Sequence, residues 1–147
     1  MAAYVVPNPW GRWSARAAAG FFAVFAVFQV ALALGAPLGF MAWGGQSVVL
    51  PDTLRRASGL AAAILLLAAA VMLVRSGDWG RTLTRWPVFA LNLLLIVQLL
   101  LNTGANLASR SEAERLIMGG ATIFGATLCI LAAVLARPVR VDRPDTI

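Results

Sequence analysis

The sequence predicts an all-α integral membrane protein, a four-transmembrane-helix bundle with an ordered interfacial loop between helices 1 and 2. The composition is 61% hydrophobic and the mean hydropathy is +0.83, which is too apolar for an ordinary soluble domain of 147 residues. Four apolar segments are each long enough to cross a hydrocarbon core of roughly 30 Å, and only a helical bundle satisfies the backbone there. We therefore expect residues 1–147 to form a single membrane domain, with helices at about 15–35, 54–75, 86–108 and 113–137.

The first helix is expected to follow an irregular leader. Met1 to Trp10 contains two prolines, which favour extended backbone, and the uncharged run from Ala17 to Leu34 begins after a pair of arginines. A positive start and an apolar run are also typical of a signal peptide, and Ala31 to Ala33 imitates a cleavage site. We interpret the segment as an uncleaved transmembrane helix.

The segment from Gly35 to Thr53 is rich in glycine and proline, yet it is also apolar and aromatic. The glycines and prolines prevent a long regular helix, whereas Trp43 and its apolar neighbours need a surface to pack against. We expect an ordered loop across one end of the bundle, with Trp43 near the depth of the lipid headgroups. A structural cap and a ligand-binding cap remain as alternatives for this loop.

The second and fourth helices are expected to pack through small side chains. Pro51 precedes a helix start before the apolar run Ala57 to Val74. Ser111 and Glu114 have the spacing of a capping box before the uncharged run Leu116 to Ala136. Both runs contain several Gly, Ala or Ser residues, which allow membrane helices to approach closely.

The third helix, Trp86 to Leu107, contains the strongest candidate site. At 100° per residue, its polar side chains share an arc of about 140°. They are Asn92, Gln98, Asn102, Thr103 and Asn106. Amides are costly in hydrocarbon unless they are hydrogen-bonded, so this face should look into protein or a cavity rather than at lipid. The amides either bind a ligand or join helices, with Gln29 of the first helix as a candidate partner. The candidate ligand-binding residues are Asn92, Gln98, Asn102, Asn106, Gln29 and Trp43.

The charged residues predict a topology. All twelve basic residues are arginines at the ends of apolar runs, where they anchor helices, so the net charge of +6 is a poor indication of nucleic-acid binding. Eight arginines lie in the N-terminal segment, the 75–85 loop and the C-terminal tail, against four in the other two loops. This bias favours both termini in the cytoplasm. The acidic residues near these arginines are interpreted as solvated clusters or capping pairs, with a headgroup-binding role as the alternative.

The side-chain inventory excludes several kinds of chemistry. The chain has no histidine, and Cys129 is its single cysteine. Imidazole-ligated haem and an intrachain disulfide are therefore excluded, and the usual zinc sites and the commonest general base are missing. We expect no catalytic residue, no metal and no cofactor. We also expect no charge inside the four spans, which leaves proton-coupled antiport without a buried carboxylate.

Several motifs in the first half of the chain follow one another in a recognisable order. They are Gly35-Ala-Pro-Leu-Gly39, Ala42-Trp-Gly-Gly45, Leu50-Pro51 and Leu54-Arg55 up to Ser58. This GAPxG…AWGG…LP order resembles a family of small bacterial four-helix integral membrane proteins without an assigned activity. The resemblance covers roughly the first half of the chain. It implies a fold and a location, and it brings no catalytic residues.

The sequence therefore predicts a non-enzymatic multi-pass protein of the bacterial cytoplasmic (inner) membrane. It would be an accessory subunit of a membrane complex or a binder of a small lipophilic ligand, such as a lipid or quinone. Its partners would be the bilayer and other membrane subunits or further copies of itself, and not nucleic acid. The alternative is a small membrane enzyme or transporter that uses the polar face of helix 3. An enzyme or carrier would leave a cavity lined by Asn92, Gln98 and Asn102, whereas a subunit would bury them against helices.

Overall fold

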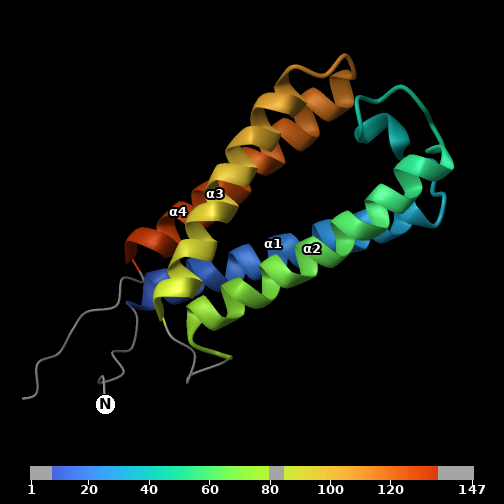
Figure 1. Cartoon of the computed structure of the whole chain (residues 1–147). Coiled ribbons are helices and arrows are strands. Elements are labelled where there is room, and N and C mark those ends of the chain that lie inside the picture. Colours follow the sequence, from blue (N-terminus) through green and yellow to red (C-terminus); the bar gives the residue numbers. More distant parts are fainter. Residues whose placement is uncertain (1–7, 80–84, 136–147) are drawn as a thin grey trace, which may run out of the picture.

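The protein folds into four long helices, in agreement with the predicted bundle (Figure 1). The computed structural model describes residues 8–79 and 85–135, and these ranges contain no strand. The elements are α1 (Pro9–Ala33), the 3-10 helix η1 (Gly39–Met41), α2 (Asp52–Ser76), α3 (Arg85–Leu107), the π-helical η2 (Glu114–Met118) and α4 (Gly119–Leu135). Four described segments are long and apolar enough to cross a membrane, namely Pro9–Ala33, Asp52–Ser76, Trp86–Leu107 and Glu114–Leu135.

The first helix begins earlier than the sequence predicts. α1 starts at Pro9 rather than near residue 15, because Asn8 caps it: the Asn8 side chain accepts a hydrogen bond from the Trp10 backbone N–H at 3.0 Å. Proline is also well suited to the first helical position, where its missing N–H would have no partner. The irregular leader expected over Met1 to Trp10 therefore ends before Pro9. Residues 1–7 lie outside the described residues.

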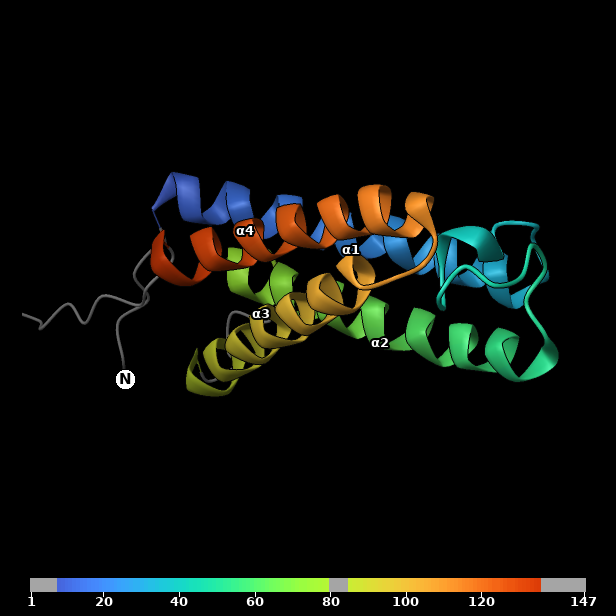
Figure 2. The ribbon, with the colours of Figure 1, turned by 90° about the horizontal axis from the view of Figure 1, so that it is seen from above.

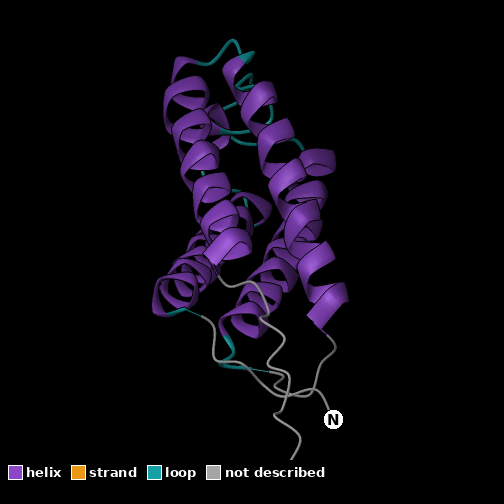
Figure 3. Cartoon of the chain, turned by 90° about the vertical axis from the view of Figure 1, so that its left-hand side faces the viewer, coloured by secondary structure: helices purple, strands orange, loops and turns teal. Residues whose placement is uncertain are grey.

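The helices alternate in direction, so α1 begins and α4 ends at the same end of the molecule (Figure 1), which we call the terminal end. The opposite end, the loop end, holds residues 34–51 between α1 and α2 and the turn 108–113 between α3 and α4. Figure 3 shows these described loops as connections at the ends of the helices. α1 packs along α2, α3 packs along α4, and α4 also lies beside α1 (Figure 2). The two pairs meet at the terminal end and diverge toward the loop end (Figure 1).

The main core is built largely from small side chains. Its buried members are Ala15, Ala18, Ala19, Phe22, Ala68, Ala69, Met72, Leu99, Ala126, Cys129 and Ala132. Gly125 of α4 shows why small residues are needed, because a Cβ added there would lie 2.5 Å from Cε1 of Phe21 in α1. Such close approach is how membrane helices gain packing contacts where no hydrophobic effect acts between them.

One arginine is buried where α2, α3 and α4 meet. Arg75 lies in the last turn of α2 and is 7% exposed. Its Nη2 donates to the carbonyl oxygens of Ala132 at 3.2 Å and Ala133 at 3.4 Å, and its guanidinium lies 5.2 Å from the ring centroid of Phe89. Arg75 directly follows the uncharged run Ala57 to Val74, where a solvated arginine is expected, and the structure buries it instead. A cation there satisfies carbonyl groups near the C-terminal end of α4, where a positive charge is favourable.

Candidate functional site

Half of the polar face of α3 joins α3 to α4. Asn92 is fully buried, and its Nδ2 donates to the Cys129 carbonyl oxygen at 3.4 Å. Thr103 is 9% exposed, and its hydroxyl lies 2.8 Å from the hydroxyl of Thr122 in α4. These two residues therefore act as interhelical contacts, one of the two roles expected for the polar face.

The other side of that face is exposed in the single chain, so the bundle's own helices do not bury all the amides. Gln98 and Asn102 are both exposed, and Nε2 of Gln98 donates to Oδ1 of Asn102 at 3.2 Å. The physical reason is the width of the polar arc. At 100° per residue Gln98 lies about 120° around the helix from Asn92, so α4 cannot cover both. The structure thus separates Gln98 and Asn102 from Asn92 instead of gathering the three around one cavity.

The remaining amides make no hydrogen bond with this pair in the described residues. Asn106 is partly buried, and its Cβ lies 4.0 Å from the position that a Cβ would take at Gly119. Gln29 of α1 is also partly buried, and its Oε1 is shielded from solvent without a hydrogen-bond donor among the described residues. Within those residues no hydrogen bond joins Gln29 to an amide of α3, so the expected pairing does not form.

The loop from Gly35 to Pro51 is ordered, as the fold prediction requires, and it packs through part of its apolar side chains, while Phe40, Val48 and Val49 stay exposed. Leu32, Ala42 and Leu50 form a second buried cluster with the partly buried Phe28, Leu38 and Leu54. Trp43 adopts a φ of 56°, which is uncommon for a residue other than glycine, and Gly44 and Gly45 follow with φ of 85° and 67°. Three successive left-handed residues turn the backbone sharply toward the α3–α4 turn.

Glu114 fastens this loop to the other helix pair. The residue is only 6% exposed. Its Oε1 accepts a hydrogen bond from the Gly44 backbone N–H at 3.2 Å, and its Oε2 accepts one from the Ser109 hydroxyl at 2.5 Å. The Ser111 hydroxyl donates to the carbonyl oxygen of Phe40 at 2.6 Å. We call Glu114, Ser109 and Ser111 the latch.

The latch corrects one sequence-based interpretation and refines another. The Ser111 hydroxyl does accept from the Glu114 backbone N–H at 3.3 Å, as a capping box requires. The carboxylate, however, is directed to the loop, and the Ser111 backbone N–H donates to the Ser109 hydroxyl instead. Glu114 is therefore a buried link between the α1–α2 loop and the α3–α4 turn, not part of a solvated cluster.

Trp43 has a structural contact and an exposed surface. Its indole Nε1 donates to the hydroxyl of Ser58 in α2 at 3.0 Å, while 43% of the residue is exposed. The hydrogen bond holds the indole against the start of α2. The exposed part of the ring remains available to lipid or to a partner.

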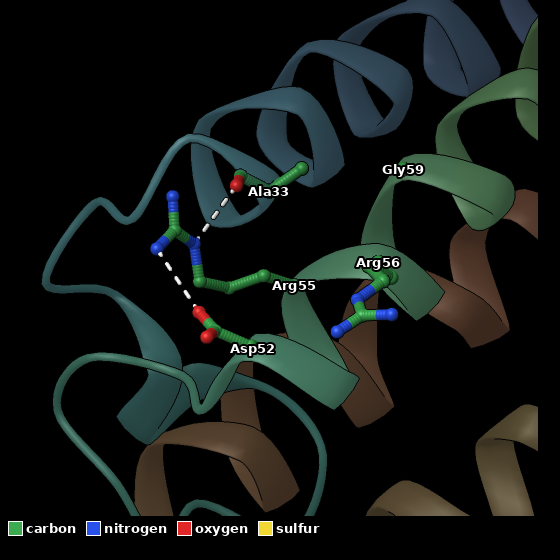
Figure 4. Close-up of a pocket in the computed structure, with 5 residues that line it drawn as sticks. All are labelled: Ala33, Asp52, Arg55, Arg56 and Gly59. Carbon is green, nitrogen blue, oxygen red and sulfur yellow. Dashed lines mark hydrogen bonds and ion pairs between the residues drawn. The ribbon is translucent and has the colours of Figure 1, made fainter.

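A pocket opens beside the loop, between the end of α1 and the start of α2 (Figure 4). It has a volume of about 470 Å³ and is lined by Ala33, Asp52, Arg55, Arg56 and Gly59. Ala33 and Gly59 are small and leave room for the pocket, and the longer side chains of Asp52 and the two arginines border it. Two arginines, Arg55 and Arg56, thus border this open pocket at the loop end.

The two arginines of the pocket are engaged differently. Arg55 Nε donates to the Ala33 carbonyl oxygen at 3.0 Å, and its Nη1 lies 3.5 Å from Oδ1 of Asp52. Arg55 thus caps the C-terminal end of α1, where a cation is favourable. Arg56 is exposed and makes no hydrogen bond or ion pair with the described part of the chain, and no dashed line reaches it in Figure 4. Its guanidinium is available to an anion.

A second charged cluster lies at the terminal end. Asp78 accepts hydrogen bonds from Arg16 Nε at 2.7 Å and Nη2 at 2.6 Å, from the Ser76 hydroxyl at 2.8 Å and from Arg12 Nη2 at 3.4 Å. Arg16 first, and then Ser76, hold the pKa of Asp78 well below its usual value. The cluster ties the first turns of α1 to the end of α2. The two arginines that bind Asp78 lie 66 and 62 residues away from it in the sequence.

The described residues contain no group of three or more potential metal ligands among His, Cys, Asp and Glu. Comparisons with models of protein families, with curated proteins and with solved structures find no match. The resemblance to small bacterial four-helix membrane proteins therefore stays a prediction. The geometry of the site offers an exposed arginine, Arg56, at the edge of a pocket at the loop end.

Proposed function

We propose that this chain is a non-enzymatic membrane protein that binds an anionic lipid at its loop end, with the lipid headgroup in the pocket beside Arg56. The observation that carries the proposal is the position of Arg56, an exposed arginine without an acidic partner in the described residues, at the edge of a pocket of about 470 Å³. Arginine suits a phosphate because its planar guanidinium donates two parallel hydrogen bonds.

The helix below Arg56 suits an acyl chain. Leu60 and Ile64 follow Arg56 at four-residue spacing and therefore share its face of α2, and Leu67 continues that face. These three side chains are 65%, 54% and 68% exposed. A headgroup on Arg56 would leave an acyl chain along this apolar row, which a free phosphate ion would not use. The ionic contact also favours an anionic lipid over a quinone, whose headgroup is neutral.

The proposed topology places this site at the outer surface of the bacterial cytoplasmic membrane. The sequence has eight arginines in the N-terminal segment, the 75–85 loop and the C-terminal tail, against four in the other two loops, and this bias favours both termini in the cytoplasm. The loop end, with the pocket and Trp43, would then face outward. A reporter fused after Ile147 should be active only in the cytoplasm, and a reporter active only outside the cell would reject this orientation.

The transporter alternative has less support from the geometry. It needs Asn92, Gln98 and Asn102 around one cavity, whereas Asn92 is fully buried against α4 and the other two are exposed. The polar face of α3 thus does not form a single polar lining.

Thermal unfolding in a neutral detergent tests the lipid proposal. A ligand that binds only the folded state stabilises it by RT ln(1 + [L]/Kd). We expect added phosphatidylglycerol to raise Tm more than phosphatidylcholine does, and the Arg56→Gln variant to lose that difference. Arg110→Gln is the matched control, because Arg110 is another exposed arginine at the loop end. Equal responses of wild type and Arg56→Gln would refute the proposal.

A further inference from the structure

We infer that α3 pairs with α3 of a second copy of this chain in a parallel, two-fold symmetric dimer. The starting observation is the exposure of Gln98 and Asn102 in the membrane-spanning part of α3. Lipid tails offer no hydrogen-bond partner to an amide, and polar residues inside membranes almost always face protein or a water-filled cavity. A protein surface is one such environment, and the residues around Gln98 indicate that it covers this pair.

The pair points away from its own bundle. Phe89 packs against Arg75 of α2, and Gln98, nine residues later, lies about 180° around the helix from Phe89 at 100° per residue. Asn92 and Thr103, which face α4, occupy a third direction. Neither α2 nor α4 can therefore reach Gln98, and the covering surface belongs to another molecule.

The residues around Gln98 form a seam suited to a helix of the same kind. The seam consists of Pro87, Leu91, Leu94, Gln98, Leu101 and Ala105, all of them exposed. Their spacings of four, three, four, three and four residues are those of the a and d positions of a coiled coil, which pack knobs into holes in a neighbouring helix. Gln98 takes an a position, where a single polar residue is known to set register and the number of strands.

The amide pair is self-complementary. Gln98 Nε2 donates to Asn102 Oδ1, which leaves the Gln98 carbonyl oxygen as an acceptor and the Asn102 amide nitrogen as a donor. Copies of a membrane protein share one orientation in the bilayer, so their α3 helices run parallel and equal positions meet at equal depth. In a two-fold interface each contact occurs twice, and the free donor of each copy can meet the free acceptor of the other.

This complementarity selects a second copy as the occupant. An unrelated helix would need a matching amide at the same depth and the same heptad phase, whereas an identical α3 supplies both without further conditions. The remaining exposed surface of α3 is purely apolar around Leu93, Val97 and Leu100, and it can face lipid at no such cost.

Cysteine cross-linking in native membranes tests the dimer. The single natural cysteine is replaced first (Cys129→Ala), and cysteines are then introduced one at a time at positions 91, 94, 101 and 105 of the seam, which keeps Gln98 in place, and at positions 93, 97 and 100 of the apolar surface. We expect oxidation to give disulfide-linked dimers from the seam positions and little or none from the other three. Equal cross-linking from both sets, or cross-linking from the apolar set alone, would overturn the inference.

A second measurement does not depend on introduced cysteines. Energy transfer between labelled copies, diluted stepwise in liposomes, gives the dissociation constant. Interhelical polar contacts in membranes contribute about 0.6 to 2 kcal/mol each, and the two-fold interface contains two of them, so Gln98→Leu should weaken the dimer about 8- to 900-fold. Leu101→Ala should also weaken it, whereas Leu100→Ala, the matched control on the apolar surface, should not. A monomer at every lipid dilution would refute the dimer, and so would a Gln98→Leu variant that dimerises as tightly as wild type.

Discussion

Removing the carboxylate of the latch should release the loop from the α3–α4 turn. In a Glu114→Ala variant the Gly44 N–H and the Ser109 hydroxyl lose their charged acceptor. Hydrogen bonds to charged groups contribute about 1.5 to 3 kcal/mol each, and the Ser109 hydroxyl can rotate toward water. We therefore expect the free energy that opens the loop to fall by about 2 to 4 kcal/mol.

Hydrogen exchange of the loop amides measures this change directly. A loss of 2 to 4 kcal/mol corresponds to exchange about 30- to 1,000-fold faster, and we expect that acceleration across residues 39–50 while α2 and α4 stay protected. Glu112→Ala is the matched control, because Glu112 is exposed and close in sequence. If loop exchange in Glu114→Ala equals that of wild type, the carboxylate does not hold the loop and the reasoning fails.

Three further predictions concern the packing and the charges. Gly125→Ala should lower the free energy of unfolding by about 1 to 3 kcal/mol, because its new Cβ meets an aromatic ring of α1, whereas Gly120→Ala meets nothing within 4 Å and should be neutral or slightly stabilising in the same detergent unfolding assay. Gly45→Ala should accelerate loop exchange more than Gly44→Ala, since both residues have positive φ but only a Cβ at Gly45 would collide with the α3–α4 turn. The ionised carboxylate of Asp78 stabilises the fold, because the pKa of Asp78 is lower in the folded protein than in the unfolded chain. This stabilisation is present above the usual pKa of aspartate, about 4, and is lost progressively as the pH falls below that value. The difference in Tm between wild type and Asp78→Asn should therefore shrink from pH 7 to pH 3.

The fold was predictable because it depends on a property of the whole segment. Each span is identified by its mean hydropathy and its length, and neither depends on a tertiary contact. The start of α1 differs from the prediction for a local reason, because Pro7 and Pro9 indicate irregular backbone, whereas proline is also favoured at the first position of a helix. The combination of Asn8 with Pro9 was the signal that could have corrected it.

The candidate site was less predictable, because periodicity shows which residues share a face but not which helices cover that face. The polar arc of α3 was identified correctly, yet α4 covers Asn92 and leaves Gln98 exposed. The latch depends on a contact between Gly44 and Glu114, 70 residues apart. The capping-box spacing located Glu114 at a helix start, but no local pattern indicates that its carboxylate reaches a distant loop.

The pocket beside Arg56 could not be predicted from local sequence patterns either. The sequence indicates arginines at a helix start, which is the usual place for an interface anchor. It does not indicate that Arg55 turns to the end of α1 while Arg56 stays without an ionic partner in the described residues. This difference between the two arginines arises only when α1 and α2 pack side by side. Because of it, Arg56 is a candidate binding residue and not only an interface anchor.

Native mass spectrometry of the purified chain tests the central claim, anionic lipid at the loop end, most directly. Wild-type protein released from micelles containing phosphatidylglycerol and phosphatidylcholine should retain phosphatidylglycerol preferentially. Arg56→Gln should lose that preference, and Arg110→Gln should keep it. Equal retention of the two lipids by wild type, or an unchanged preference in Arg56→Gln, would contradict the account.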